Sequence, residues 1–283
     1  MNTLSPEFVQ ELLAAIDRIQ AFPVSVQNIL KLTRDNSSAP RDLVDVIQRD
    51  PIVTIKVLRV VNSAYYSLPR QITSIEHAVV LLGFNTIKNL ALGIAALSLA
   101  PGQLHGGLDP KAYLHHSLAT AALTRQLGAR FALVDVNDFF IGGLLHDFGK
   151  VVLAQAMPAQ FRKAMEYGLW HEVSLHRALL EVTGIDQAEV GAMLLAHWRF
   201  PAALVQGIGH QYVRDESAPV LSVCIHAANQ ICKQAGVDFA AGDKAQPLSA
   251  HMEQTLGGTL ESVTQSLGDV AAVVQAATQF SDL

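Results

Sequence analysis

The chain has 283 residues, is 50% hydrophobic and carries a formal net charge of −5. That length supports one large domain or two smaller ones, and the acidic balance without any lysine or arginine cluster predicts no binding to nucleic acid. The sequence shows no signal peptide and no apolar run long enough to span a bilayer, and Cys224 and Cys232 are too far apart on one helix for a disulfide. We therefore expect a cytoplasmic protein with reduced thiols.

Nearly every segment of the first hundred residues has the periodicity of an amphipathic helix, and no segment is a convincing strand, so the sequence predicts an all-α fold. Asp50 and Ser74 are expected to cap helices at their N-terminal ends, and Gly83 is expected to end one. The expected helices cover residues 6–19, 24–33, 41–49, 52–62, 74–81 and 84–99.

A segment rich in glycine and proline, Pro101–Asp109, predicts an internal boundary between a helical part at 1–104 and a second helical part at 105–283. Asp109 is expected to cap the next helix, and Gly149 is expected to interrupt one. A polar loop is expected over 237–247. The expected helices of the second part cover residues 110–127, 137–145, 151–154, 158–167, 171–182, 187–198, 201–211, 219–234, 249–256 and 261–279.

The stretch Leu144–Lys150 (LLHDFGK) carries an adjacent His-Asp pair between two apolar runs. Burying His146 and Asp147 is costly unless the two side chains are paired or bound to a metal. Consecutive helical residues point about 100° apart, so both can bind one ion only if the ion lies between them. In the alternative interpretation His146 caps a helix and Asp147 is solvated, and the heptapeptide alone leaves both interpretations open.

Several short motifs follow one another along the chain. They are Phe22-Pro23, Asp50-Pro51, Lys56–Ser63, Ile72–Ala78 and Leu81–Gly83 in the first half, and His116-Ser117, His146–Lys150, Glu189–Gly191 and Trp198 with Pro201 in the second. Together these motifs resemble the HDOD domain, a divergent branch of the HD phosphohydrolase superfamily, over about residues 15–235. The resemblance implies an N-terminal helical bundle packed on a helical domain like that of the HD superfamily. As part of this resemblance, Asn62-Ser63 is expected to organise the junction between the two halves.

The resemblance also implies a metal site. In active members of the superfamily the metal ligands are a His, a His-Asp pair and a distant Asp. His116, His146 and Asp147 match the first three, whereas Asn229 stands where the last Asp is expected. Asn229 is neutral, so it is a weaker candidate ligand.

Two further departures concern a second metal. Related cyclic-dinucleotide phosphodiesterases carry His at two positions where this chain has Gln187 and Gln211. The resemblance therefore implies that a second ion is not held and that hydrolysis is improbable. His210, beside Gln211, is a weaker candidate ligand. Lys150 is expected either to contact phosphate, as in active relatives, or to pair with Asp147.

Three functions remain open from the sequence. The leading expectation is a non-catalytic signal-transduction module that acts through signalling protein partners, as bacterial HDOD proteins generally do. Its degenerate pocket would bind a nucleotide, or weakly bind a divalent metal (Mn, Fe, Mg or Zn), with no cofactor required. The first alternative is a metal-dependent phosphohydrolase that uses His116, His146, Asp147 and Lys150. The second is a structural helical adaptor whose His-Asp pair is a buried hydrogen-bonded relic.

Overall fold

The computed structural model of the chain describes residues 39–62, 70–84, 86–88, 90–91, 108–131, 136–198, 200–239 and 245–278, with a few single residues besides. Every regular element within these ranges is a helix, which confirms the predicted all-α fold. The expected helices at 6–19, 24–33 and 84–99 fall largely outside the described residues. None of the described helices is long and apolar enough to cross a membrane.

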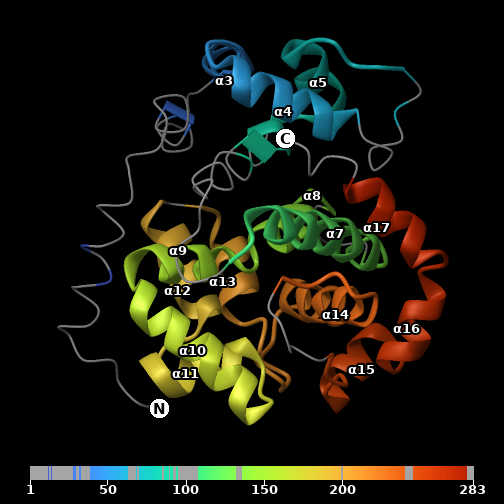
Figure 1. The fold of residues 1–283 in the computed structure, drawn as a ribbon. Helices are drawn as coiled ribbons and strands as arrows, with labels where there is room; N and C mark the ends of the chain where they lie inside the picture. The colour runs from blue at the N-terminus through green and yellow to red at the C-terminus, as the bar shows by residue number, and fades with distance from the viewer. Residues whose placement is uncertain are drawn as a thin grey trace.

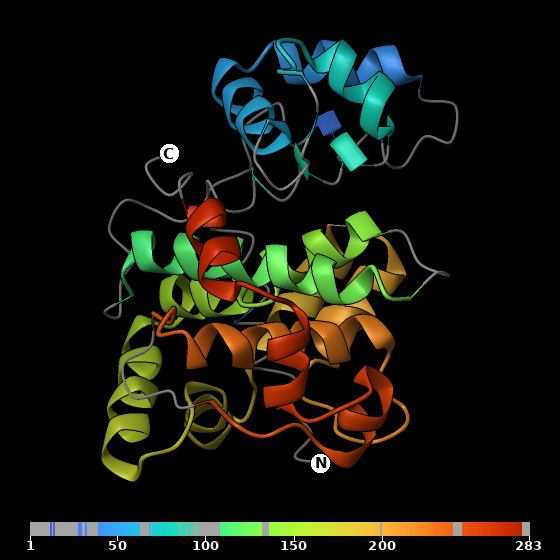
Figure 2. The ribbon, with the colours of Figure 1, turned by 90° about the vertical axis from the view of Figure 1, so that its right-hand side faces the viewer.

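The helices form a small group at one end of the molecule and a larger body beneath it (Figures 1 and 2). The small group contains α3 to α5, which pack on one another through Ile47, Val57 and Ile75. The predicted boundary at Pro101–Asp109 lies mostly outside the described residues, and the division into 1–104 and 105–283 stays a prediction. The helices are α3 (Pro40–Gln48), α4 (Pro51–Val61), α5 (Ile75–Leu82), α7 (Pro110–Gly128), α8 (Val136–Leu145), α9 (Phe148–Ala156), α10 (Pro158–His171), α11 (Leu175–Thr183), α12 (Gln187–His197), α13 (Ala202–Gly209), α14 (Val220–Gln234), α15 (Ala250–Leu256), α16 (Leu260–Ser266) and α17 (Val270–Thr278).

Side-chain caps fix several helix starts where the sequence predicts them. The Asp50 carboxylate accepts a hydrogen bond from the backbone N–H of Val53 at 3.1 Å. The Ser74 hydroxyl accepts one from His77 at 3.2 Å, and the Asp109 carboxylate accepts one from Lys111 at 2.9 Å. Each cap satisfies a backbone donor that the first turn of a helix leaves without a partner.

Asn62 acts within the small helical group. Its amide nitrogen donates to the carbonyls of Leu58 and Ile72, and its amide oxygen accepts from the backbone N–H of Ile72 at 2.6 Å. The side chain therefore ties the end of α4 to the chain just before α5. Among the described residues the Asn62 side chain bonds only within the small group, and Ser63 lies outside those residues, so its expected role at the junction between the two halves stays a prediction.

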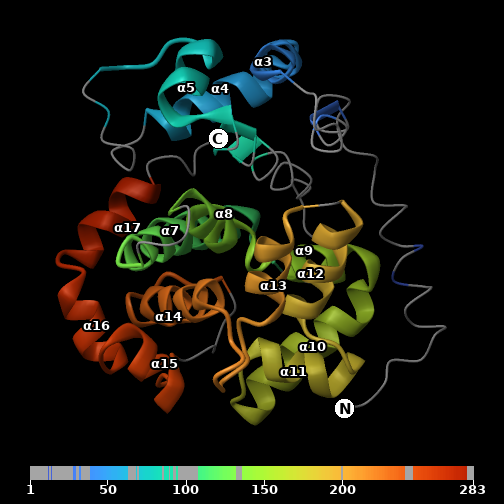
Figure 3. The same ribbon diagram turned by 180° about the vertical axis from the view of Figure 1, so that it is seen from behind.

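The larger body is built around α7, which packs against α8, α14 and α17 (Figures 1 and 3). The backbones of α7 and α8 approach closely because Gly143 lacks a side chain. A Cβ added there would lie 2.6 Å from the Thr124 hydroxyl and 2.7 Å from the Cα of Ala121. This close crossing brings the C-terminal end of α8, and the His-Asp pair that follows it, against the buried face of α7.

Three predicted helix boundaries were wrong. The chain breaks at His146-Asp147, not at Gly149, which lies inside α9. The helix expected over 158–167 continues to His171, and the helix expected over 171–182 begins only at Leu175, because Glu172 takes a left-handed conformation with φ of 51° and Ser174 caps the new start. The C-terminal helix expected over 261–279 is interrupted at Gly268, whose φ is 78°.

Candidate metal centre

Three potential metal ligands converge in the core of the larger body. His116 comes from the middle of α7, and His146 and Asp147 form the break between α8 and α9. The two Nε2 atoms are 3.3 Å apart, and the Asp147 Oδ2 atom lies 3.2 Å from His146 Nε2 and 3.6 Å from His116 Nε2. All three residues are completely buried. Within the described residues this is the one group of His, Cys, Asp and Glu side chains placed to share an ion.

Backbone carbonyls hold both imidazole rings in one orientation. His116 Nδ1 donates to the carbonyl of Val237 at 2.7 Å, and His146 Nδ1 donates to the carbonyl of Gly143 at 2.7 Å. A carbonyl can only accept, so the proton of each neutral ring sits on Nδ1. Each Nε2 atom therefore presents a lone pair to the other and to Asp147. This outer hydrogen bonding is the arrangement that orients histidine ligands at metal sites.

The geometry and chemistry of this cluster fit a divalent metal ion. Two ligands bound tetrahedrally at about 2.1 Å from one ion are about 3.4 Å apart, close to the three distances in the cluster. When both imidazoles are in the neutral state that binds a metal, their Nε2 atoms and the Asp147 carboxylate place three hydrogen-bond acceptors face to face, an arrangement that a shared cation stabilises. The second carboxylate oxygen of Asp147, Oδ1, is buried without a hydrogen-bond partner.

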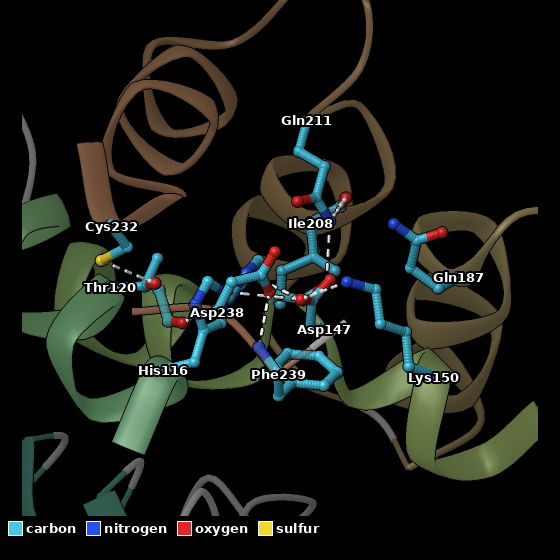
Figure 4. A network of polar contacts seen from close by, with 12 residues as sticks. His116, Thr120, Asp147, Lys150, Gln187, Ile208, Gln211, Cys232, Asp238 and Phe239 are labelled. Atoms are coloured by element: carbon cyan, nitrogen blue, oxygen red, sulfur yellow. Dashed lines mark hydrogen bonds and ion pairs between the residues drawn. The ribbon is translucent and has the colours of Figure 1, made fainter. Parts of the chain in front are cut away.

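Lys150 supplies a positive charge beside the cluster. Its side chain is 1% exposed, and its ammonium donates to Asp147 Oδ2 at 2.7 Å (Figure 4). Burial favours a raised pKa for the Asp147 carboxyl, but attraction to His146, Lys150 and His116 outweighs it and holds this pKa well below its usual range. Of the two roles expected for Lys150, the structure shows the pairing with Asp147.

The His116 ring carries little positive charge of its own. Burial, and then repulsion from His146, lower the pKa of His116 to about 3. His116 is therefore neutral at physiological pH, which is the state in which an imidazole binds a metal.

The loop after α14 completes the wall of the cluster, although the sequence predicts only a polar loop there. Phe239 packs edge-on against His116 and Tyr113, with ring centroids 5.2 and 5.4 Å away. The Lys150 ammonium lies 4.6 Å from the centre of the Phe239 ring. The one signal in the sequence was that Phe239 is an isolated aromatic residue between charged and small residues. Nothing in the sequence indicates where its ring packs.

The two weaker candidate ligands, Asn229 and His210, differ in burial and in hydrogen bonding. Asn229 is 1% exposed on α14, and neither amide atom has a hydrogen-bond partner, so its carbonyl is available to a ligand. It lies one turn before Cys232, whose thiol accepts from Thr120 of α7. His210 is exposed at the end of α13, and its Nδ1 donates to its own helix at Gln206. Its exposure and its bond to Gln206 favour the interpretation in which His210 is not a metal ligand.

Gln187 and Gln211 are both buried, and both use their amide nitrogens within the protein. Gln211 donates to the backbone carbonyl of His146 at 2.8 Å, and Gln187 donates to the Tyr212 hydroxyl at 2.7 Å. Their amide oxygens have no hydrogen-bond partner. Gln211 thus supports the backbone of the His-Asp pair.

A helical body that holds a histidine of one helix against a His-Asp pair at a helix break has the architecture of the HD superfamily. Within that superfamily, residues 19–213 match the HDOD domain family, and the chain belongs to this family. The fold is similar to that of an HDOD domain protein with unknown function from Geobacter sulfurreducens, with 20% identity, a TM-score of 0.76 and 97% of each chain covered.

Two further relatives broaden the comparison. A protein from Shewanella amazonensis SB2B, provisionally named a phosphohydrolase, has 21% identity and a TM-score of 0.72, with 95% of this chain and 97% of that chain covered. An uncharacterized protein of Treponema pallidum (strain Nichols) is 24% identical over 234 residues, which is 80% of this chain. The match spans only 45% of the length of the Treponema protein.

Proposed function

We propose that this chain is a non-catalytic signal-transduction module that acts through a protein partner and holds one divalent cation in a sealed centre. The observation that carries the proposal is the combination of a complete ligand triangle with full burial. His116, His146 and Asp147 are 0% exposed, so no substrate reaches the ligand atoms in this conformation. The regulatory role rests on membership of the HDOD family.

The polar groups around the centre also favour a structural ion over a catalytic one. A hydrolytic metal activates a bound water and therefore needs an open coordination position that substrate can approach. Here Lys150 covers Asp147 Oδ2, Phe239 covers Lys150 and His116, and Gln211 is bound to the backbone of His146. These side chains exclude solvent from the centre. Gln187 and Gln211 stand at the two positions where the resemblance would place histidine ligands for a second ion.

Lys150 should also keep the affinity for the ion low. An ammonium and a divalent ion that share one carboxylate repel each other. Two unit charges about 4 Å apart interact by about 4 kcal/mol at an effective dielectric constant of about 20, and the double charge of the ion doubles this repulsion. The cation would have to be manganese, iron, magnesium or zinc, of which zinc and iron suit imidazole best and magnesium least.

Calorimetric titration with manganese and zinc, together with a phosphodiester assay, tests the proposal. We expect the wild type to bind one ion, His146→Ala to bind none, and neither protein to hydrolyse bis(p-nitrophenyl) phosphate in excess manganese. The exposed His197→Ala variant is the matched control and should bind like the wild type. Absence of binding by the wild type would contradict the metal centre and favour a buried hydrogen-bonded relic.

The second candidate function is a metal-dependent phosphohydrolase. The observation in its favour is the placement of Lys150 beside the ligand triangle, where a point charge could hold a phosphate if the loop around Phe239 moved away. Manganese-dependent turnover that disappears in both His146→Ala and Lys150→Ala would support it and would overturn the non-catalytic proposal.

A further inference from the structure

A second polar cavity lies at the surface, at the end of the molecule opposite α3 to α5. It has a volume of about 370 Å³ and is formed where the turn between α10 and α11 meets the loops before α14 and before α15. Figures 1 and 3 show α10, α11 and α15 at this end. The volume falls within the range of about 300–1,000 Å³ that is usual for small-molecule sites.

Two arginines from different elements line this cavity. Arg177 stands in the first turn of α11, and Arg214 stands in the loop between α13 and α14. The Arg214 guanidinium donates to the side-chain carbonyl of Gln246 at 2.9 Å, and the Arg214 backbone carbonyl accepts from the Ser249 hydroxyl at 3.0 Å. These bonds hold Arg214 in place before any ligand arrives, which lowers the entropy cost of binding.

The described side chains that line the cavity favour an anion. Arg177 and Arg214 contribute two guanidinium groups, and Glu172 is the one carboxylate among the described lining residues. Asp186, just outside this lining, lies 3.6 Å from the His176 ring. Arg177 also forms an ion pair with Glu181, one turn further along α11. Guanidinium groups present paired donors that match the oxygen atoms of a phosphate, and two of them on separate elements can clamp one group from two sides.

An aromatic ring forms another part of the cavity wall. His176 lines it, and the His176 ring stacks on Tyr212 with centroids 3.6 Å apart and planes 17° apart. Tyr212 accepts a hydrogen bond from Gln187, the first residue of α12. The cavity is larger than a single phosphate requires, so it has room for an organic group beside an anionic one.

We propose that this cavity binds a small phosphate-bearing metabolite. The site goes beyond the proposed function, because its residues are distinct from those of the metal centre and its occupation needs no metal. In a signalling module such a site would receive a soluble input. The recognised feature is the phosphate, held by Arg177 and Arg214, with the organic part beside His176.

Calorimetry on the full chain tests the site with inorganic pyrophosphate and with adenosine 5′-monophosphate, in buffer that contains a metal chelator. Both probes should bind, and adenosine without phosphate should not. Arg177→Ala and Arg214→Ala should each weaken binding by at least about tenfold. Glu172→Gln should strengthen it, because a carboxylate that opposes an anionic ligand is removed from the lining.

Two control variants test whether binding depends on this cavity. Arg41→Ala removes an exposed arginine from α3, far from the cavity, and should leave binding unchanged. His146→Ala should also leave it unchanged, so failure of the metal centre and failure of this site are distinguishable. The proposal is overturned if neither probe binds up to about 10 mM, or if Arg41→Ala weakens binding as much as Arg214→Ala does. Thermal melting of each variant verifies that it is folded.

Discussion

At the scale of single residues, the larger helical body contains buried polar side chains with atoms that have no hydrogen-bond partner. His226 and Asn229 lie on the buried face of α14 and are 2% and 1% exposed. Neither His226 Nδ1 nor the amide of Asn229 has a partner. Such groups cost stability, so each one calls for a functional or structural reason. The two residues lead to different predictions.

His226 should make the protein less stable in mild acid. Burial, and then repulsion from Arg214 and Lys233, lower the pKa of His226 from its ordinary value of 6.5 to about 4. The folded state therefore stays neutral while the unfolded state gains a proton, and the free energy of unfolding falls as pH drops from about 6.5 to about 4. The full loss amounts to about 3 kcal/mol. Urea titrations at several pH values measure the free energy of unfolding. For His226→Gln this free energy should fall less steeply with decreasing pH than it does for the wild type.

The control for this prediction is His197→Gln, which removes a histidine from an exposed helix end. It should follow the wild-type dependence of stability on pH. If His226→Gln also follows the wild-type dependence, acid destabilisation does not come from His226.

Asn229→Asp should increase affinity for a divalent ion. The change adds a negative charge at the position that matches the last carboxylate of active relatives, and a net gain of about 1.4 kcal/mol would raise affinity tenfold. Without metal the variant should be less stable than the wild type, because two buried carboxylates would then repel each other. Calorimetric titration with manganese measures both proteins. Gln234→Glu, an exposed change on the same helix, should leave affinity unchanged.

At the scale of elements, close helix crossings place the cluster, and two glycines permit them. Gly143 lets α8 approach α7, and Gly149 lets α9 approach α12. A Cβ at Gly149 would lie 1.9 Å from the carbonyl oxygen of Gln187. Because Gly149 follows Asp147 by two residues, this crossing also fixes where the His-Asp pair sits.

Gly149→Ala should therefore destabilise the fold although alanine favours helices. The added methyl must push α12 away from α9, and overpacking of this kind costs about 1–3 kcal/mol. The matched control is Gly191→Ala on the facing helix, where the nearest atom would be 3.4 Å away and the contact is ordinary. Thermal melting should show a lower transition temperature for Gly149→Ala and little change for Gly191→Ala.

The same elements show how far the sequence could be read. Helical periodicity and the caps Asp50, Ser74 and Asp109 are local signals, and they predict the helices they belong to. The packing role of Gly149 could not be predicted from local signals. A side chain is excluded there by the backbone of Gln187, which lies 38 positions away in the sequence. The grouping of His116 with His146 came from the resemblance to a family, since no local pattern joins them.

At the scale of the whole molecule, the cluster draws on segments far apart in the chain. His116 is 30 residues from His146 and 121 residues from Val237, which accepts its outer hydrogen bond. The loop that carries Val237 and Phe239 could be predicted only as a polar connection, because its contacts are long-range. The centre forms only when α7, the α8–α9 break and this loop are all in place, so its integrity reports on the folding of the entire larger body.

Complete burial of the ligand atoms also sets the rate at which an ion would leave. Escape requires the protein to open, so release should proceed at the rate of local opening and should not depend on chelator concentration once chelation is fast. Stopped-flow mixing of the manganese-loaded protein with increasing chelator should reach a plateau. Phe239→Ala should raise that plateau because it removes the aromatic cover over Lys150 and His116. A protein with such a centre would retain its ion long after the surrounding concentration had fallen, and so would keep a record of earlier metal supply.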